Sequence, residues 1–374
     1  LGAQVMLDDF GAGYSSLQML SDLPIDGIKI DRSYVARIET DWRVRNLVTS
    51  LAEFARSTNM IVVAEGVDVA GAPVAVRLLG RDLVIWRSAS GEVVAAPDRC
   101  PHREAPLSGG TLEDGCLVCP YHGWKFADEG RCVEVPSSGS GRPVPPAAHL
   151  ATVRAQERYG LVWLCLGDPV ADIPAMAAEH DDAYRRINSG VEVWATSATR
   201  MTDNFLDISH FPYVHVGTFG IQDNQDVPKI EMEPLDDDFF GYEYEVEVDN
   251  AQGAASSGLT DAIITRRMTT GFNLPFTVRS TIHYETGLDH LILLCSTPID
   301  DVTSYFTFVI WRNDDFSVPG QEVIVFDRAI GAEDKVMLEK VKGVLPLDQK
   351  ATVSVQSDKP SVEWRRRLAT LLDG

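Results

Sequence analysis

The pattern of apolar and polar residues divides the chain into three stretches of different character. Residues 1 to about 72 combine short apolar runs, at 4–7, 27–30 and 60–64, with helical periodicity that is longest at 44–55. Short buried strands that alternate with helices are typical of βα units around a parallel sheet. We therefore expect the first stretch to be α/β.

The second stretch, residues 73–166, changes to short strands that are separated by Gly and Pro. Strands are expected at 74–79, 83–87, 92–96, 116–119 and 160–166, and the Pro-, Gly- and Ser-rich segment 136–146 is expected to be a loop. This spacing predicts a small all-β domain.

The third stretch, residues 167–374, alternates helical patterns with longer β runs at 242–248, 276–284, 291–297 and 304–311. From about residue 326 the periodicity is helical again. This combination predicts an α+β domain.

Composition narrows the classes of function. A length of 374 residues allows two or three domains, and a net charge of −22 argues against nucleic acid or an anionic membrane as partner. The chain shows neither an apolar run long enough to span a membrane nor the features of a signal peptide, so we expect a cytoplasmic protein. It begins with Leu1 rather than Met, which fits a fragment, and its six cysteines are too sparse for a disulfide scaffold.

Two short segments combine cysteine and histidine at metal-binding spacing. Cys100-Pro-His102 is followed, sixteen residues later, by Cys119-Pro-Tyr-His122. Such a set can hold zinc or a [2Fe-2S] cluster. Because each segment offers one thiolate and one imidazole, it suits a cluster in which one iron takes both Cys and the other takes both His. A structural zinc site is the alternative, and Cys116 and Cys132 are expected to pack in the interior.

A second metal signal lies in the segment 203–215. His210 and His215, with one carboxylate, would form the facial triad of non-haem Fe(II) oxygenases, which leaves open positions on the metal. On an ideal helix the two rings would point about 140° apart. We expect Pro212 to break or kink that helix and to re-aim the second ring. Two histidines at this spacing are a weak signal by themselves.

The segments CPHREAPLSGG (100–110) and CPYHGWKF (119–126) closely resemble the Rieske domain of ring-hydroxylating oxygenases. From about residue 74 to the C-terminus the chain is similar to these proteins, and 296–312 and 364–367 look most like the vanillate O-demethylase and phthalate oxygenase branch. The resemblance implies an all-β Rieske [2Fe-2S] domain and a helix-grip α+β catalytic domain with a mononuclear Fe(II). Its implied ligands are Cys100, His102, Cys119 and His122 for the cluster, and His210 and His215 for the iron.

The third iron ligand must be a distant carboxylate. Asp334 is the best candidate, because the family places an Asp in a similar acidic helix, and because Asp334 shares an inward stripe with Met337, Leu338 and Val341. Glu333 and Asp327 are the fallbacks, and a solvated acidic helix is the alternative.

Two further residues receive roles from the resemblance. Asp207 lies three residues before His210, on the same face of the expected helix. It would bridge the two metal centres across a subunit boundary, accepting hydrogen bonds from His210 and from His122 of the neighbouring chain. Asn204 is expected to line the iron pocket.

The partners follow from the chemistry of two metal centres. The chain has no G-x-G-x-x-G turn for NAD or FAD, so a separate flavin- or ferredoxin-type NAD(P)H reductase is expected to supply electrons. The resemblance also implies a homotrimer that acts on O₂ and a small aromatic substrate, with monooxygenation favoured over ring cis-dihydroxylation. An electron carrier is the rival class, but it would not need His210 and His215. Five aromatic residues could line the substrate pocket or simply pack in the core: Phe239, Phe240, Tyr242, Phe276 and Trp311.

The N-terminal stretch resembles a different family. LDDFGAGYSSL (7–17), IKIDRS (28–33) and AEGV (64–67) are similar to the second half of an EAL-type cyclic-di-GMP phosphodiesterase barrel. The resemblance implies metal binding by Asp8 and Asp9 and water positioning by Lys29 and Glu65. Half of a barrel leaves open sheet edges, so we expect no phosphodiesterase activity. We favour an artefact of gene fusion, truncation or sequence assembly as the origin of this N-terminal stretch, over an evolved hybrid of a sensor and an oxygenase.

Overall fold

The structure is a computed structural model that describes residues 6–10, 27–30, 61–64, 71–139, 142–167, 169, 172–250 and 257–373. The chain forms two compact units, Leu1–Ala72 and Pro73–Gly374. Among the described residues, no helix is both long and apolar enough to cross a membrane.

The first unit contains a small parallel sheet. Its strands are β1 (Met6–Phe10), β2 (Gly27–Ile30) and β3 (Ile61–Ala64), paired in the order β1-β2-β3. The runs 27–30 and 60–64 correspond to β2 and β3, and the run 4–7 overlaps β1 at Met6 and Leu7. The expected parallel pairing is confirmed. Asp8 and Asp9 fall on β1 and Lys29 on β2. The helical segment expected at 44–55 and the residue Glu65 lie outside the described residues.

The second unit begins with short antiparallel strands around one apolar core. A three-stranded sheet and a four-stranded sheet of order β10-β9-β8-β7 are followed by a hairpin. The strands are β4 (Val74–Leu78), β5 (Arg81–Arg87), β6 (Val93–Pro97), β7 (Thr111–Glu113), β8 (Cys116–Val118), β9 (Lys125–Phe126), β10 (Cys132–Glu134), β11 (Arg154–Arg158) and β12 (Leu161–Cys165). Short 3-10 turns occur at Leu107–Gly109, Asp128–Gly130, Pro136–Ser138 and Pro146–Ala148. Val84, Trp86, Leu107, Leu117 and Phe126 form the centre of this core.

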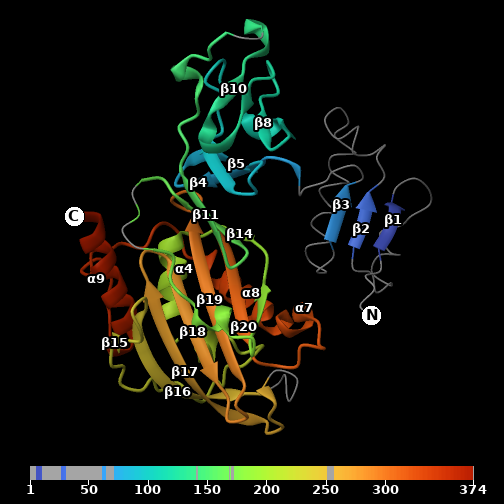
Figure 1. The fold of residues 1–374 in the computed structure, drawn as a ribbon. Helices are drawn as coiled ribbons and strands as arrows, with labels where there is room; N and C mark the ends of the chain where they lie inside the picture. Colours follow the sequence, from blue (N-terminus) through green and yellow to red (C-terminus); the bar gives the residue numbers. More distant parts are fainter. Residues whose placement is uncertain are drawn as a thin grey trace. The chain divides into compact units, whose positions relative to one another are not determined.

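An eight-stranded antiparallel sheet dominates the remainder of the unit (Figure 1). Its order is β13-β20-β19-β18-β17-β16-β15, and β14 also pairs with β20. The strands are β13 (Arg185–Asn188), β14 (Glu192–Trp194), β15 (Glu233–Pro234), β16 (Phe240–Asp249), β17 (Ile263–Asn273), β18 (Thr277–His283), β19 (Asp289–Pro298) and β20 (Ser304–Arg312). The four longer strands expected in this region are confirmed within a few residues, whereas β17 was not predicted.

The burial of β17 alternates along the strand, as a period of two requires. Ile264, Arg266 and Met268 are buried, while Thr265 and Arg267 between them are exposed. A charged residue therefore stands among apolar ones on the inner face of the sheet.

Helices pack against the sheet and against one another. They are α4 (Ala198–Leu206), α5 (Phe211–Val214), α7 (Gly320–Val323), α8 (Val325–Leu338) and α9 (Lys359–Asp373), with 3-10 turns at Ala177–His180 and Gln356–Asp358. Helix α4 contacts β18 and β19 as well as α8 and α9. Trp364 and Leu368 of α9 pack with Leu206 of α4 and Phe272 of β17. The helical tail expected from about residue 326 is interrupted, because turns separate α8 from α9.

Candidate active site

His210 and His215 flank a single helical turn rather than sharing one long helix. Helix α4 ends at Leu206, and Asp207 has extended backbone angles (φ −89°, ψ 142°). His210 and His215 then stand at the two ends of α5, with Pro212 in its first turn, where proline is well tolerated because the first N–H groups have no intrahelical partner. Two expectations are therefore wrong. Pro212 lies in the first turn of a helix instead of breaking one, and Asp207 and His210 do not share a helical face.

The two imidazoles converge with Asp334 on one point. Nε2 of His210 lies 3.0 Å from Nε2 of His215. Oδ1 of Asp334 lies 3.5 Å from the first and 3.4 Å from the second. Among the described residues, these three side chains form a group whose donor atoms all lie within 4.8 Å of one another. Two nitrogens bonded at right angles to one metal, at the ~2.1 Å found for zinc, would be separated by about 3.0 Å.

A carboxylate holds the opposite edge of each imidazole. Nδ1 of His210 lies 3.0 Å from Oδ2 of Asp207, and Nδ1 of His215 lies 3.0 Å from Oε2 of Glu333. Because a carboxylate accepts hydrogen bonds, each Nδ1 carries a hydrogen, and the Nε2 atoms of the two rings face each other. Two Nε2 lone pairs that face each other repel unless a proton or a metal ion lies between them. The donor set therefore fits a divalent metal ion.

Asp207 is positioned by a tight turn of its own backbone. Its Oδ1 accepts hydrogen bonds from the backbone N–H and the hydroxyl of Ser209, at 2.9 and 2.6 Å. Its Oδ2 also accepts from the backbone N–H of His210 at 3.2 Å. Such local bonds are typical of Asp in turns. They hold the carboxylate against the His210 ring without any helix between the two residues.

Glu333 is the residue whose role the sequence did not reveal. It was only a fallback iron ligand, yet the structure places its carboxylate behind His215, where the backbone N–H of Gly217 (3.1 Å) and the hydroxyl of Thr218 (2.7 Å) donate to it. A Cβ atom at position 217 would lie 2.5 Å from Oε1 of Glu333. A side chain at position 217 would therefore require the Glu333 carboxylate to shift. The acidic pair 333–334 was the one signal in the sequence, and its helical phase alone could not separate the two roles.

The two histidines of the site differ in the direction of their pKa shifts. Burial lowers the pKa of His210, but Asp207 and Asp334 outweigh it and raise the pKa to about 9. For His215, burial and the neighbouring His210 keep the pKa below its usual value despite Asp334. One imidazole therefore carries a proton when no metal is bound, and a metal ion would take the place of that proton.

The other predicted residues occupy different positions. Asn204 donates from Nδ2 to Oδ1 of Asp334 at 2.9 Å and lines the pocket, as expected. Asp327, the second fallback ligand, lies away from the converging group, with Oδ1 3.1 Å from Nε2 of His290. It is therefore not part of the metal-ligating set.

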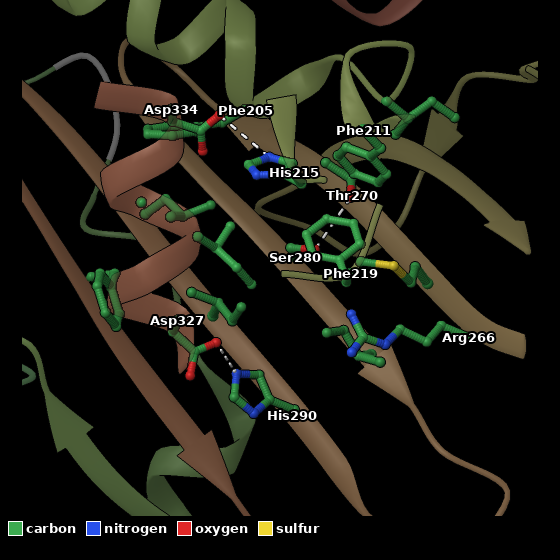
Figure 2. Close-up of a pocket in the computed structure, with 18 of the residues that line it drawn as sticks. Phe205, Phe211, His215, Phe219, Arg266, Thr270, Ser280, His290, Asp327 and Asp334 are labelled. Atoms are coloured by element: carbon green, nitrogen blue, oxygen red, sulfur yellow. Dashed lines mark hydrogen bonds and ion pairs between the residues drawn. The ribbon is translucent and has the colours of Figure 1, made fainter. Parts of the chain in front are cut away.

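A cavity of about 130 Å³ adjoins the converging side chains. Figure 2 shows His215 and Asp334 at one end of it and His290 and Asp327 at the other. Most of its wall is apolar, and the lining comes mainly from α8 and from strands β17 to β20; it includes Phe219, Met268, Ile282, Leu294, Phe306 and Ile330.

The five aromatic residues that we considered as wall candidates do not line this cavity. They belong instead to three separate packing clusters: Phe239 and Trp311 in one, Tyr242 in another, Phe240 and Phe276 in a third. Their aromatic character reflects core packing. The cavity wall takes its aromatic side chains from other positions.

The Cys–His segments form two loops whose backbones close on themselves. In the first, the N–H of Cys100 donates to the carbonyl of Ala105 at 2.9 Å; in the second, the N–H of Cys119 donates to the carbonyl of Trp124 at 2.9 Å. Both cysteines are buried. Gly123 completes the second loop with a φ of +69°, a conformation that side chains disfavour.

These loops bring the two histidine rings together. The ring centroids of His102 and His122 lie 4.4 Å apart, and Trp124 stacks on His102 at 4.7 Å. Nδ1 of His102 is buried without a hydrogen-bond partner among the described residues. Burial raises the pKa of Cys100 to about 11, so metal binding would release its proton. An orphaned ring nitrogen beside paired buried thiols fits the two-Cys, two-His ligand set of a Rieske cluster.

The cysteines outside the motif differ from each other. Cys132 packs in the apolar core, as expected, whereas Cys116 on β8 is only half-buried.

Comparison with known proteins agrees with this geometry. Residues 59–153 match the Rieske [2Fe-2S] domain, and residues 194–374 match the vanillate O-demethylase oxygenase C-terminal domain. Methylxanthine N1-demethylase NdmA of Pseudomonas putida is 32% identical over 306 residues, which cover 80% of this chain and 82% of the relative. The chain belongs to the Rieske oxygenases. The oxygenase component of dicamba O-demethylase from Stenotrophomonas maltophilia is 37% identical over 147 residues, or 38% of this chain and 42% of the relative.

Solved structures show the same fold. The structure of Pseudomonas putida NdmA with caffeine matches with a TM-score of 0.72 at 29% identity, and the match covers 83% of this chain and 87% of that one. This Rieske oxygenase is therefore an oxidoreductase and the terminal oxygenase component of its system. Its cofactors are a [2Fe-2S] cluster and, as in its family, a mononuclear iron.

The N-terminal region of this Rieske oxygenase matches the EAL domain over residues 1–85. That match extends beyond the segment 1–72 expected from the sequence and overlaps the first strands of the Rieske match.

Proposed function

We propose that this Rieske oxygenase hydroxylates or demethylates a small substituted aromatic compound, using O₂ and electrons from a separate reductase. One observation carries the proposal. Nε2 of His210, Nε2 of His215 and Oδ1 of Asp334 converge beside a mainly apolar cavity. Such a place suits the oxidation of a small aromatic substrate, because the apolar wall can pack against a ring and a metal held by three side chains would leave open positions.

Each side chain around the iron position has a separate task. His210, His215 and Asp334 would hold the metal, which supplies O₂ activation when bound. Asp207 and Glu333 hold the Nδ1–H of the two imidazoles, which keeps the Nε2 lone pairs directed inward. Asn204 orients Asp334 through its amide. The carboxylates also increase the basicity of the rings and strengthen metal binding.

Cys100, Cys119, His102 and His122 would hold the cluster, which supplies electrons one at a time when bound. His122 is exposed, while both cysteines are buried. An exposed imidazole is available to a partner surface. We therefore keep the proposal that Asp207, partly exposed at 23%, faces His122 of a neighbouring subunit within a homotrimer.

The names of the relatives favour demethylation. They include a methylxanthine N1-demethylase, a dicamba O-demethylase and a vanillate O-demethylase. Ring cis-dihydroxylation is the second candidate within the class. The division at residues 166 and 167 between the Rieske and catalytic domains, and the helix-grip description, stay predictions.

Metal analysis of the purified chain tests the proposal. The wild type should hold about three irons and two acid-labile sulfides per chain, and Asp334→Ala should lose about one iron while keeping the sulfide. A wild type with only two irons would fit an electron carrier and not an oxygenase. Bound zinc without sulfide would exclude both the oxygenase and the electron carrier. Methoxylated aromatics are then incubated with the enzyme and a surrogate reductase, and the release of formaldehyde is measured. Demethylation releases formaldehyde, whereas ring dihydroxylation does not.

A further inference from the structure

One charged residue of the cavity wall makes no ion pair with any residue that the structure describes. Arg266 lies on β17 between Ile264 and Met268 and is only 4% exposed. Strand alternation forces it inward, because its neighbour Arg267 points outward and pairs with Glu243 at 2.7 Å. Figure 2 shows the side chain of Arg266 extending from the sheet toward the interior of the cavity.

No hydrogen bond or ion pair to the described residues satisfies the guanidinium of Arg266, and its Nε is buried without a partner. Its neighbours are aromatic. The guanidinium carbon lies 5.4 Å from the centroid of Phe219 and 5.8 Å from that of Tyr284. Cation–π contacts leave the N–H groups of arginine without acceptors, so these donors remain available to a ligand.

The nearby carboxylates are already engaged by other groups. Asp327 lies 3.1 Å from Nε2 of His290, whose Nδ1 lies 2.5 Å from a guanidinium nitrogen of Arg312. Asp314 accepts from both Arg312 and Arg185, at 3.1 and 2.7 Å. Among the described residues, no carboxylate therefore contacts the guanidinium of Arg266. Burial makes such a positive charge unfavourable until an anion joins it.

The cavity limits the size of that anion. Its volume is about 130 Å³, and an apolar cavity of about 150 Å³ holds one benzene molecule. The space therefore suits a single ring. In Figure 2, Arg266 lies toward the His290 end of the cavity, away from Asp334.

We propose that Arg266 selects the substrate by binding an anionic group on a single aromatic ring, with a carboxylate as the preferred group. A carboxylate is planar and accepts two parallel hydrogen bonds from a guanidinium. The ring then points its opposite side toward His210, His215 and Asp334. This inference rests on the proposed function, since it concerns the cavity in which the oxidation would occur.

Direct binding to the metal-loaded enzyme tests the role of Arg266 without turnover. Benzoate, benzenesulfonate and the neutral benzamide are titrated calorimetrically into the wild type, Arg266→Met and the matched control Arg267→Met, which changes the outward neighbour. The wild type should bind benzoate roughly tenfold to 100-fold more tightly than benzamide. Arg266→Met should abolish that preference, and Arg267→Met should retain it. Benzenesulfonate binding that also depends on Arg266 would support the wider anionic class.

Two results would overturn the inference: equal binding of benzoate and benzamide to the wild type, or a benzoate preference that survives in Arg266→Met. The first comparison needs no variant, so it decides even if Arg266→Met does not fold. A separate turnover assay distinguishes the two proposals. Benzoate preference without oxidation of any aromatic would remove only the proposed function, whereas oxidation of neutral aromatics without that preference would remove only the role of Arg266.

Discussion

Oε2 of Glu333 lies 3.0 Å from Nδ1 of His215, on the edge of the ring opposite the Nε2 that faces Asp334. Two consecutive acidic residues of α8 therefore contact the two edges of one imidazole. Any shift of α8 would therefore move the metal-binding carboxylate of Asp334 and the carboxylate of Glu333 that orients His215 at the same time. Among the residues that do not themselves bind the metal, Glu333 is therefore the most informative one to test.

Replacing Glu333 with Gln should weaken iron binding at the mononuclear site by roughly tenfold to 100-fold, because the His215 ring loses its charged acceptor. Iron retention against a competing chelator measures this effect, and the visible spectrum of the cluster should not change. Glu322→Gln, at an exposed position on α7, is the matched control. Gly217→Ala should act in the same direction, since its Cβ would displace the Glu333 carboxylate. Unchanged iron retention in both variants would contradict the role of Glu333.

Asp207→Asn should leave both metal centres loaded but lower turnover by roughly 100-fold. The amide keeps the shape of the side chain and loses the charge that faces His210. Stopped-flow reoxidation of the reduced cluster, with substrate and O₂ present, should slow in parallel. Asp223→Asn, at an exposed position, should behave as the wild type. Normal turnover in Asp207→Asn would remove the proposed bridge between the centres.

Asp327 should contribute stability that depends on pH. Burial by itself would raise its pKa, but His290, and then Arg312 and Arg266, outweigh burial and hold the pKa below the usual 3.8. The folded carboxyl therefore binds a proton less readily than the unfolded one. Its contribution is complete above the unfolded pKa and is lost as the pH falls through the folded pKa.

Urea titrations of the wild type and Asp327→Asn from pH 7 to pH 3 measure this contribution. The difference in the free energy of unfolding between the two proteins should be constant at neutral pH and should shrink below about pH 4. A difference that does not change over this range would show that the charge of Asp327 does not stabilise the fold.

Trp311→Phe should destabilise the protein without changing substrate affinity. The indole of Trp311 is 1% exposed, packs edge-on against Tyr159, and donates to Glu179 at 2.7 Å. Losing that bond and part of the ring should cost about 1–3 kcal/mol. Urea denaturation measures the cost. Because Trp311 lies outside the cavity wall, a change in KM would contradict its assignment to the core.

The strands were largely predictable, because alternation of apolar and polar residues is a local signal. Runs such as 304–311 correspond closely to β20 (Ser304–Arg312). Strand β17 was missed because Arg266, Arg267, three threonines and one glycine among its eleven residues hide its apolar face. The course of the chain around Pro212 was also mispredicted, since a proline inside a helical pattern either ends a helix or begins one.

The sequence by itself determined the three metal-binding segments. Cys100 with His102, Cys119 with His122, and His210 with His215 are each close enough in the chain for short loops to bring them together. Only the tertiary structure decided which carboxylate joins His210 and His215, because Asp334 and Glu333 lie more than a hundred residues away and differ by a single step of α8. The tertiary structure also decided that no carboxylate among the described residues contacts Arg266. Whether a charge meets a counter-charge depends on every element packed around it, and no local pattern records that.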